Sequence, residues 1–110
     1  MAWNKYHSKK ITCDGIRFDS VHECERYQEL RLLERAGEIR DLQRQVSFTL
    51  IPAQYVNGKL RERACRYVAD FAYHRGDDYV VEDAKGVRTA EYIIKRKLML
   101  EKHGIIIQEV

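Results

Sequence analysis

Hydrophobic and polar residues alternate over several short segments of this chain. In residues 45–52 (QVSFTLIP), the apolar residues Val46, Phe48 and Leu50 occupy every second position until Pro52. This period of two predicts a strand with one apolar face. Three further segments combine apolar residues with flanking turn signals, and we predict strands at residues 64–74, 78–85 and 105–110.

Two other segments carry the start and stop signals of helices. Ser20 is a favourable N-cap, Glu23 follows three residues later, and Gly37 is a typical stop signal. These residues predict a helix over residues 21–36. A second helix is predicted over residues 90–103, where Gly104 supplies the stop signal.

The first predicted element is a hairpin at residues 11–18, closed by the strong turn signal Asp14-Gly15. The resulting order is hairpin, helix, three strands, helix and strand, which is typical of an α/β fold. A length of 110 residues fits one domain with a single modest core. Because no linker or repeat divides the chain, we expect one domain over residues 1–110.

Composition narrows the class of protein. The chain is 45% hydrophobic and 34% charged, which is typical of a soluble globular protein. No apolar run approaches the length of a membrane span, and the first residues, MAWNKYHSKK, lack the apolar core of a signal peptide. We therefore expect a cytoplasmic protein. Three cysteines without CxxC spacing favour reduced thiols over a disulfide or zinc site: Cys13, Cys24 and Cys65.

The distribution of charge is more informative than the formal net charge of +3. Between Lys85 and Lys97 there are five basic residues and one acidic residue. Arg61, Arg63 and Arg66 form a second basic group. Such groups are typical both of an ordinary solvated surface and of a surface that contacts nucleic acid, and charge alone does not separate the two.

The segment Val80–Gly86 (VVEDAKG) places both signs of charge at the end of a predicted strand. Either a two-residue or a four-residue loop before this strand pairs it so that Asp70 lies opposite Asp83, with Cβ atoms roughly 4.5–5.5 Å apart. Two carboxylates at that distance repel each other. A positive group is therefore expected between them, either Lys85 or a divalent cation with oxygen ligands. A bulged or three-residue turn would shift the register and remove this expectation.

Glu23 has two possible roles. With Ser20 it forms a capping box, which explains the glutamate without any chemistry. It also shares a helical stripe with Tyr27 and Leu30, so its side chain would lie on the face that covers the sheet and reach the aspartate pair. Glu25 falls on a different face and is expected at the surface.

Together these residues resemble the PD-(D/E)XK nuclease superfamily: an acid on the first helix, Asp70 on a strand, Asp83-Ala84-Lys85 on the next strand, and a basic helix after it. Ala69 stands where the superfamily often has proline. More narrowly, the chain resembles a phage-borne family of small nucleases, catalogued as a domain of unknown function and akin to Holliday-junction resolvases. Gln45 resembles a retained position of that family, without a role that the sequence explains. The segments that carry the resemblance are DGIRFDSVHECERYQEL, LERAGEIRDLQRQVSFTLIP, YVADFAYH, VVEDAKGVRT and EYIIKRKL.

The resemblance implies a restriction-endonuclease-like αβββαβ core, with a central mixed sheet flanked by two helices. It implies a metal-dependent endonuclease that acts as a homodimer on branched phage DNA. Neither a small-molecule cofactor nor membrane binding is expected. Asp70, Asp83 and the carbonyl of Ala84, helped by Glu23, would hold Mg²⁺, for which Mn²⁺ would substitute. The metal would polarise the scissile phosphate and lower the pKa of a bound water. Lys85 would orient that water or stabilise the charge that develops on the phosphoryl oxygens.

The second helix is expected to contact DNA. Arg88, Tyr92 and Lys95 follow a helical spacing suited to backbone phosphates, and Tyr92 is a candidate for stacking on an unpaired base. Lys97 would extend along the apolar stripe toward the site or pair with Glu101. An alternative function is a non-catalytic DNA-binding module on the same fold, although such a module would need no opposed acids.

Overall fold

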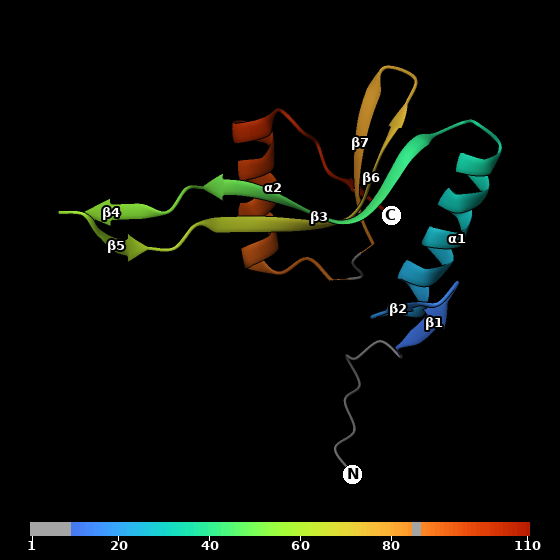
Figure 1. Ribbon diagram of the computed structural model, residues 1–110, viewed down its shortest axis with the longest axis horizontal. Helices are drawn as coiled ribbons and strands as arrows, with labels where there is room; N and C mark the ends of the chain where they lie inside the picture. The colour runs from blue at the N-terminus through green and yellow to red at the C-terminus, as the bar shows by residue number, and fades with distance from the viewer. Residues whose placement is uncertain (1–9, 85–86) are drawn as a thin grey trace, which may run out of the picture.

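A computed structural model gives the fold of residues 10–84 and 87–110 (Figure 1). Its centre is a four-stranded mixed sheet in the order β3-β6-β7-β8, in which the first three strands are antiparallel and β8 runs parallel to β7. These strands are β3 (Arg40–Ile51), β6 (Cys65–Arg75), β7 (Asp78–Asp83) and β8 (Gln108–Glu109). The fold is therefore of mixed α/β content.

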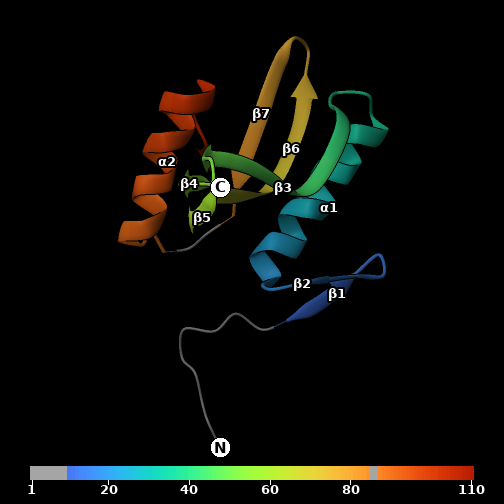
Figure 2. The same cartoon turned by 60° about the vertical axis from the view of Figure 1, so that its left-hand side comes forward.

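Two helices lie on opposite sides of this sheet (Figure 2). They are α1 (Val21–Arg35) and α2 (Ala90–His103), and both predicted helices are thereby confirmed to within one residue. Each begins at a hydroxyl cap, because Ser20 accepts a hydrogen bond from the Glu23 amide and Thr89 accepts one from the Tyr92 amide. Within the described part of the chain, neither helix is long and apolar enough to cross a membrane.

Each helix covers its own apolar cluster. Tyr27 and Leu30 of α1 pack in one cluster with Phe71 of β6. Met99 of α2 packs in the other with Val81 of β7. Burying a side chain of this size stabilises the fold by about 1.5–3 kcal/mol, so these contacts hold the two helices against the sheet and determine which of their residues face it.

The turn between β6 and β7 has the predicted register. Arg75 pairs with Asp78 and, four residues further from the turn, Phe71 pairs with Glu82. Gly76 has a left-handed φ of 60°, which glycine adopts without a steric cost and which the tight turn requires. The same register, continued by one pair, brings Asp70 to the level of Asp83.

Two predicted strands have different lengths in the structure. β3 begins at Arg40 rather than at residue 45, because its first half continues to pair with β6 beyond a bulge near Asp41. β8 comprises only Gln108 and Glu109, whereas the prediction covered residues 105–110. Two of the three isoleucines that suggested a longer strand pack in the core instead, Ile107 buried and Ile105 partly buried, whereas Ile106 is exposed.

Two hairpins lie outside the main sheet. The first, β1 (Ile11–Cys13) and β2 (Ile16–Phe18), confirms the prediction at Asp14-Gly15. The second was not predicted and consists of β4 (Gln54–Val56) and β5 (Lys59–Glu62). Its turn residues, Asn57 and Gly58, have φ values of 52° and 77°, as a two-residue turn of this kind requires. We call residues 54–62 the arm, because they project away from the rest of the chain (Figure 1).

The expectation of three reduced thiols was wrong for two of the cysteines. Cys13 and Cys24 form a disulfide, whereas Cys65 is a free thiol. The β1–β2 hairpin packs on the first turn of α1 and brings the two Cα atoms to 6.4 Å, within the range that a disulfide spans. Their separation of 11 residues gave no sign of this, since the contact depends on how the hairpin folds back.

Candidate active site

Glu23 lies in the first turn of α1, where the structure forms the Ser20 half of the predicted capping box, while among the described residues the Glu23 carboxylate contacts Arg44 and Gln45. Its amide donates to the Ser20 hydroxyl at 3.0 Å, which completes the N-cap. Its carboxylate points away from the cap, and one oxygen accepts from Arg44 at 3.3 Å and from Gln45 at 3.4 Å. Only 6% of the residue is exposed. Capping therefore leaves the carboxylate available to the site.

Gln45 of β3 connects two acids that are far apart in the sequence. Its side-chain nitrogen lies 3.4 Å from a carboxylate oxygen of Glu23 and 3.4 Å from one of Asp70. Its φ of 52° is unusual for a strand residue and costs about 1–3 kcal/mol. The neighbouring pairs, Arg44 with Phe71 and Val46 with Ala69, hold this conformation in place.

Asp70 and Ala84 link β6 to the end of β7. Asp70 is partly buried, and its second carboxylate oxygen accepts from the Ala84 amide at 2.8 Å. This bond orients Asp70 toward the residues that follow Asp83. The predicted ligand role of the Ala84 carbonyl stays a prediction, and the predicted catalytic Lys85 lies outside the described residues.

Asp83 is 1% exposed and is held by a side chain of β6 and by the residue that follows β8. A carboxylate oxygen accepts from the Tyr67 hydroxyl at 2.6 Å, and its backbone carbonyl accepts from the Val110 amide at 3.0 Å. Burial and the hydrogen bond to Asp83 raise the pKa of the Tyr67 phenol, so this side chain stays a neutral donor. Tyr67 was not predicted, because no sequence signal indicates which tyrosine reaches the acid.

The electrostatics of the site favour the neutral form of Glu23. Burial, and then the negative charge of Asp70, raise the pKa of the Glu23 carboxyl, while Arg44 opposes this shift. The Arg44 guanidinium lies 4.3 Å from the centre of the Phe18 ring, which limits its freedom to move toward the acids. A cation placed between Glu23 and Asp70 would relieve the repulsion that Arg44 compensates only in part.

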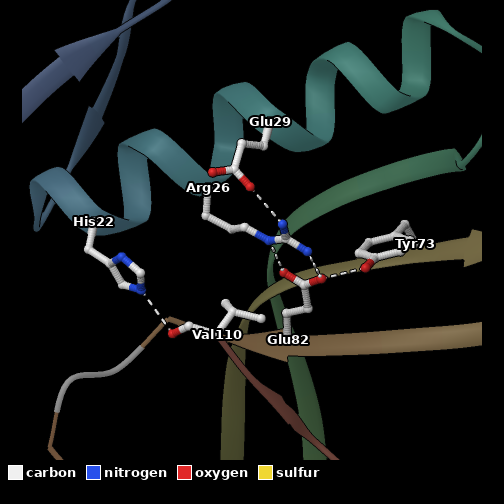
Figure 3. Close-up of polar contacts among 6 residues, drawn as sticks. All are labelled: His22, Arg26, Glu29, Tyr73, Glu82 and Val110. Carbon is white, nitrogen blue, oxygen red and sulfur yellow. Dashed lines mark hydrogen bonds and ion pairs between the residues drawn. The ribbon is translucent and has the colours of Figure 1, made fainter.

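A second polar cluster fixes the strand that carries Asp83 (Figure 3). Arg26 donates to both carboxylate oxygens of the buried Glu82, at 2.8 and 2.6 Å, and Tyr73 donates to the same carboxylate. Burial and this bond raise the pKa of Tyr73 to about 12. On the same face of α1, His22 forms a 2.8 Å hydrogen bond with the Val110 carbonyl. The cluster was not predicted, because its members are far apart in the sequence.

Most of the side chains predicted to contact DNA from the second helix already have partners within the protein. Arg88 lies before the helix rather than in it and pairs with Glu109 at 2.6 Å. Tyr92 is only 4% exposed and donates to Glu109 at 2.7 Å, so its ring is buried in this structure and its stacking on a base stays a prediction. Its ring was needed for the core beside Tyr67.

The two lysines predicted to contact DNA have different surroundings. Lys95 pairs with Glu91 at 3.1 Å, one turn earlier on α2. Lys97 lines a small hollow with the apolar residues Leu100 and Ile107. None of the acids near Gln45 lines that hollow, and the reach of Lys97 toward the site stays a prediction.

The carboxylates of Glu23 and Asp70 fit a hard cation such as Mg²⁺, provided that substrate phosphates supply further ligands. Among the described residues, no three His, Cys, Asp or Glu side chains form a ready metal site. Glu23 and Asp70 nevertheless approach a common amide on Gln45. Mg²⁺ is commonly held by one or two carboxylates together with waters and substrate phosphates, which two neighbouring acids can satisfy.

Comparison with known families gives one match. A family model described as "Protein of unknown function (DUF1064)" matches residues 3–108. The chain belongs to the DUF1064 family. The matched part of this DUF1064 protein contains Glu23, Gln45, Asp70 and Asp83. No curated protein matches the chain, and no solved structure does.

Proposed function

We propose that this DUF1064 protein is a metal-dependent endonuclease that hydrolyses phosphodiester bonds in DNA. The observation that carries the proposal is the Gln45 amide, which joins the carboxylates of Glu23 and Asp70 from two separate elements. Asp70 is joined in turn to Ala84, the residue after the buried Asp83. A protein gains little stability from gathering acids, so their convergence favours a cation-dependent reaction.

Each residue has a distinct role in this proposal. Asp70, Asp83, Glu23 and the Ala84 carbonyl would hold Mg²⁺, with Mn²⁺ as a substitute. The ion would supply positive charge that polarises the scissile phosphate and makes a neighbouring water easier to deprotonate. The Gln45 amide would hold the Glu23 and Asp70 carboxylates near each other, and Lys85 would orient the attacking water or stabilise the charge that develops on the phosphoryl oxygens.

The finer fold assignment and the substrate belong to the same proposal. We infer a restriction-endonuclease-like αβββαβ core of the PD-(D/E)XK type, supported by the order α1, β3, β6, β7, α2 and β8. We also infer that the enzyme is a homodimer that acts on branched or recombining phage DNA. These inferences rest on the resemblance of the sequence, since fold alone does not establish function.

One observation favours a second candidate, a DNA-binding module without cleavage. Arg44 already places a positive charge 3.3 Å from Glu23, so the protein compensates part of the acidic charge without a metal. In such a module the acids would be structural, and a divalent cation would change neither stability nor DNA processing.

The test is incubation with labelled linear, flapped and four-way DNAs, in the presence of Mg²⁺ or EDTA. Cleavage is expected with Mg²⁺, should be lost in EDTA, and should be lost in Asp70→Asn. The matched control is Asp78→Asn, which changes an exposed aspartate at the hairpin turn and should cleave normally. DNA binding with no Mg²⁺-dependent cleavage would select the binding module instead.

Competition at physiological salt tests the substrate class. An excess of linear duplex should fail to displace a bound four-way junction. If linear duplex competes equally well, the enzyme is a general nuclease and the inference of branched DNA is wrong.

A further inference from the structure

The side chains of β4 and β5 in the arm do not pack in the core of the protein. Every residue of β4 and β5 is exposed, and the exposed fractions of Tyr55, Val56 and Leu60 are 65, 56 and 53%. A hairpin of two short strands is marginally stable by itself in water. Large apolar side chains on an exposed hairpin mark a surface that another molecule covers.

We propose that the arm binds duplex DNA about one helical turn away from the candidate active site. This proposal deepens the proposed function and rests on it, because it takes DNA as the substrate. The contact surface proposed for the arm lies on neither helix and does not include Glu23, Asp70 or Asp83.

The charge of the arm and its base favours DNA. Residues 54–66 hold four basic side chains and one acidic side chain, a net charge of +3 that equals the formal net charge of the whole chain. The four are exposed: Lys59, Arg61, Arg63 and Arg66. Within the described residues none of them forms an ion pair, whereas Arg88, Lys95 and Arg96 are each paired with a glutamate. Positive charge that is not neutralised internally is available to phosphates.

The shape of the arm also suits a duplex. Two strands joined by the tight Asn57-Gly58 turn form a narrow ribbon, and the major groove of DNA is wide enough to admit a two-stranded ribbon. Tyr55 lies opposite Leu60, and Val56 lies opposite Lys59. Each face therefore presents an apolar side chain beside groups that can contact sugar or phosphate.

The reach of the arm sets where it would touch the DNA. Gln54 at the start of the arm follows Gln45 at the site by nine positions, which span at most about 30 Å of extended chain. One turn of duplex is about 34 Å. At the base of the arm, Arg66 lines a hollow of about 240 Å³ with Lys95, Glu91 and Tyr67. Tyr67 is the donor to Asp83, so Arg66 at the base of the arm shares this hollow with a residue that contacts the site.

A second copy of the chain is the competing occupant. A symmetric contact between two arms would bring the basic group of one copy, which includes Lys59 and Arg61, close to the basic group of the other. Like charges at that distance are unfavourable, and Glu62 is the only acid of the arm that could offset them. Charge complementarity therefore favours DNA over self-association.

The experiment measures DNA affinity in EDTA, where no cleavage occurs, at salt concentrations from 50 to 200 mM. A 30-base-pair duplex is the probe, and the variant combines K59A, R61A and R63A. Three lost phosphate contacts should reduce the slope of log affinity against log salt by about 2.7. The ratio of wild-type to variant affinity should then fall about 40-fold across this range.

The matched control removes three exposed basic residues outside the arm, with R35A, R75A and K102A. Its slope should change by less than about one unit. The charge-conserving variant K59R, R61K and R63K should keep the wild-type slope, and equal melting temperatures would show that all variants fold. Equal slope losses in the arm variant and the control would overturn the proposal, because net charge alone would then explain binding.

Two further outcomes separate this proposal from the proposed function. If wild-type protein cleaves DNA with Mg²⁺ but the arm variant keeps its slope, the arm proposal fails and the nuclease stands. If the slope depends on the arm but no Mg²⁺-dependent cleavage occurs, the nuclease fails and the arm still binds DNA. Sedimentation that shows loss of a dimer in the arm variant, with DNA affinity unchanged, would identify the arm as an interface between copies and overturn the proposal.

Discussion

Arg26 of α1 forms a two-bond ion pair with Glu82 of β7, the residue that immediately precedes Asp83. Glu82 is 1% exposed, and Tyr73 donates to the same carboxylate. The pair fixes the end of β7 relative to α1, which is the helix that supplies Glu23. The position of Asp83 therefore depends on the ion pair that the neighbouring Glu82 forms with Arg26.

Removing one partner of this pair should be costly. Arg26→Ala leaves a buried carboxylate without its cation and should lower the free energy of unfolding by about 3–5 kcal/mol. Urea denaturation measures the change. Arg31→Ala is the matched control, since Arg31 pairs with Glu34 in a more exposed position of the same helix and should cost less than about 1 kcal/mol. Similar losses in both variants would show that the Glu82 pair has no special role.

Gln45 should matter for cleavage more than for folding. Gln45→Ala removes the amide between Glu23 and Asp70 and should reduce the cleavage rate about 10–100-fold, as loss of a group that orients ligands does. Gln45→Gly should cleave as slowly as Gln45→Ala. Its folded state should be at least as stable as that of Gln45→Ala, because glycine adopts the observed φ of 52° without strain. Gln43→Ala, an exposed glutamine of the same strand, is the control. Normal cleavage by Gln45→Ala would exclude this role.

The raised pKa of Glu23 predicts how stability changes with pH. The folded state binds the Glu23 proton more tightly than the unfolded state does, so Glu23 costs stability as the pH rises from 4.5 through its higher folded pKa. Glu23→Gln should flatten this part of the curve and raise stability at neutral pH in EDTA. Chemical unfolding between pH 4 and pH 8 tests this, with the exposed Glu25→Gln as control. A steeper loss in Glu23→Gln would contradict the assignment.

Divalent cations should stabilise the folded protein. An ion that binds only the folded state adds about 2.7 kcal/mol when its concentration is 100 times its dissociation constant. Asp70→Asn keeps an acceptor for the Ala84 amide but loses the charge, so the Mg²⁺-dependent gain in melting temperature should disappear. Asp78→Asn should retain it. If calorimetry detects no cation binding to wild type, with or without DNA, the metal proposal fails.

Lys85 should separate cleavage from binding. Lys85→Ala should reduce cleavage about 100–1,000-fold, as loss of one group that stabilises developing charge does, while DNA affinity stays nearly constant. Lys95→Ala should instead weaken binding to all sequences alike, and only moderately because Glu91 already pairs with it. Rates and affinities measured on one flapped DNA test both variants. Parallel losses of affinity and rate in Lys85→Ala would contradict the division of roles.

The sequence by itself determined the elements whose causes are local. The cap at Ser20, the stop at Gly104, the turns at Asp14-Gly15 and Gly76, and the period of two after Gln45 all depend on residues within a few positions of one another. The register of β6 and β7 was predictable for the same reason, because a tight turn leaves few ways to pair its strands.

Only the tertiary structure decided which distant residues meet. Between β3 and β6 the chain forms the arm, so no count along the sequence could place Gln45 beside Asp70. The disulfide of Cys13 and Cys24 and the pair of Arg26 and Glu82 likewise depend on how α1 packs. Tyr92 has a helical spacing that suited a surface role, yet the core required its ring. Packing satisfies all contacts at once, whereas a sequence pattern records only local preference.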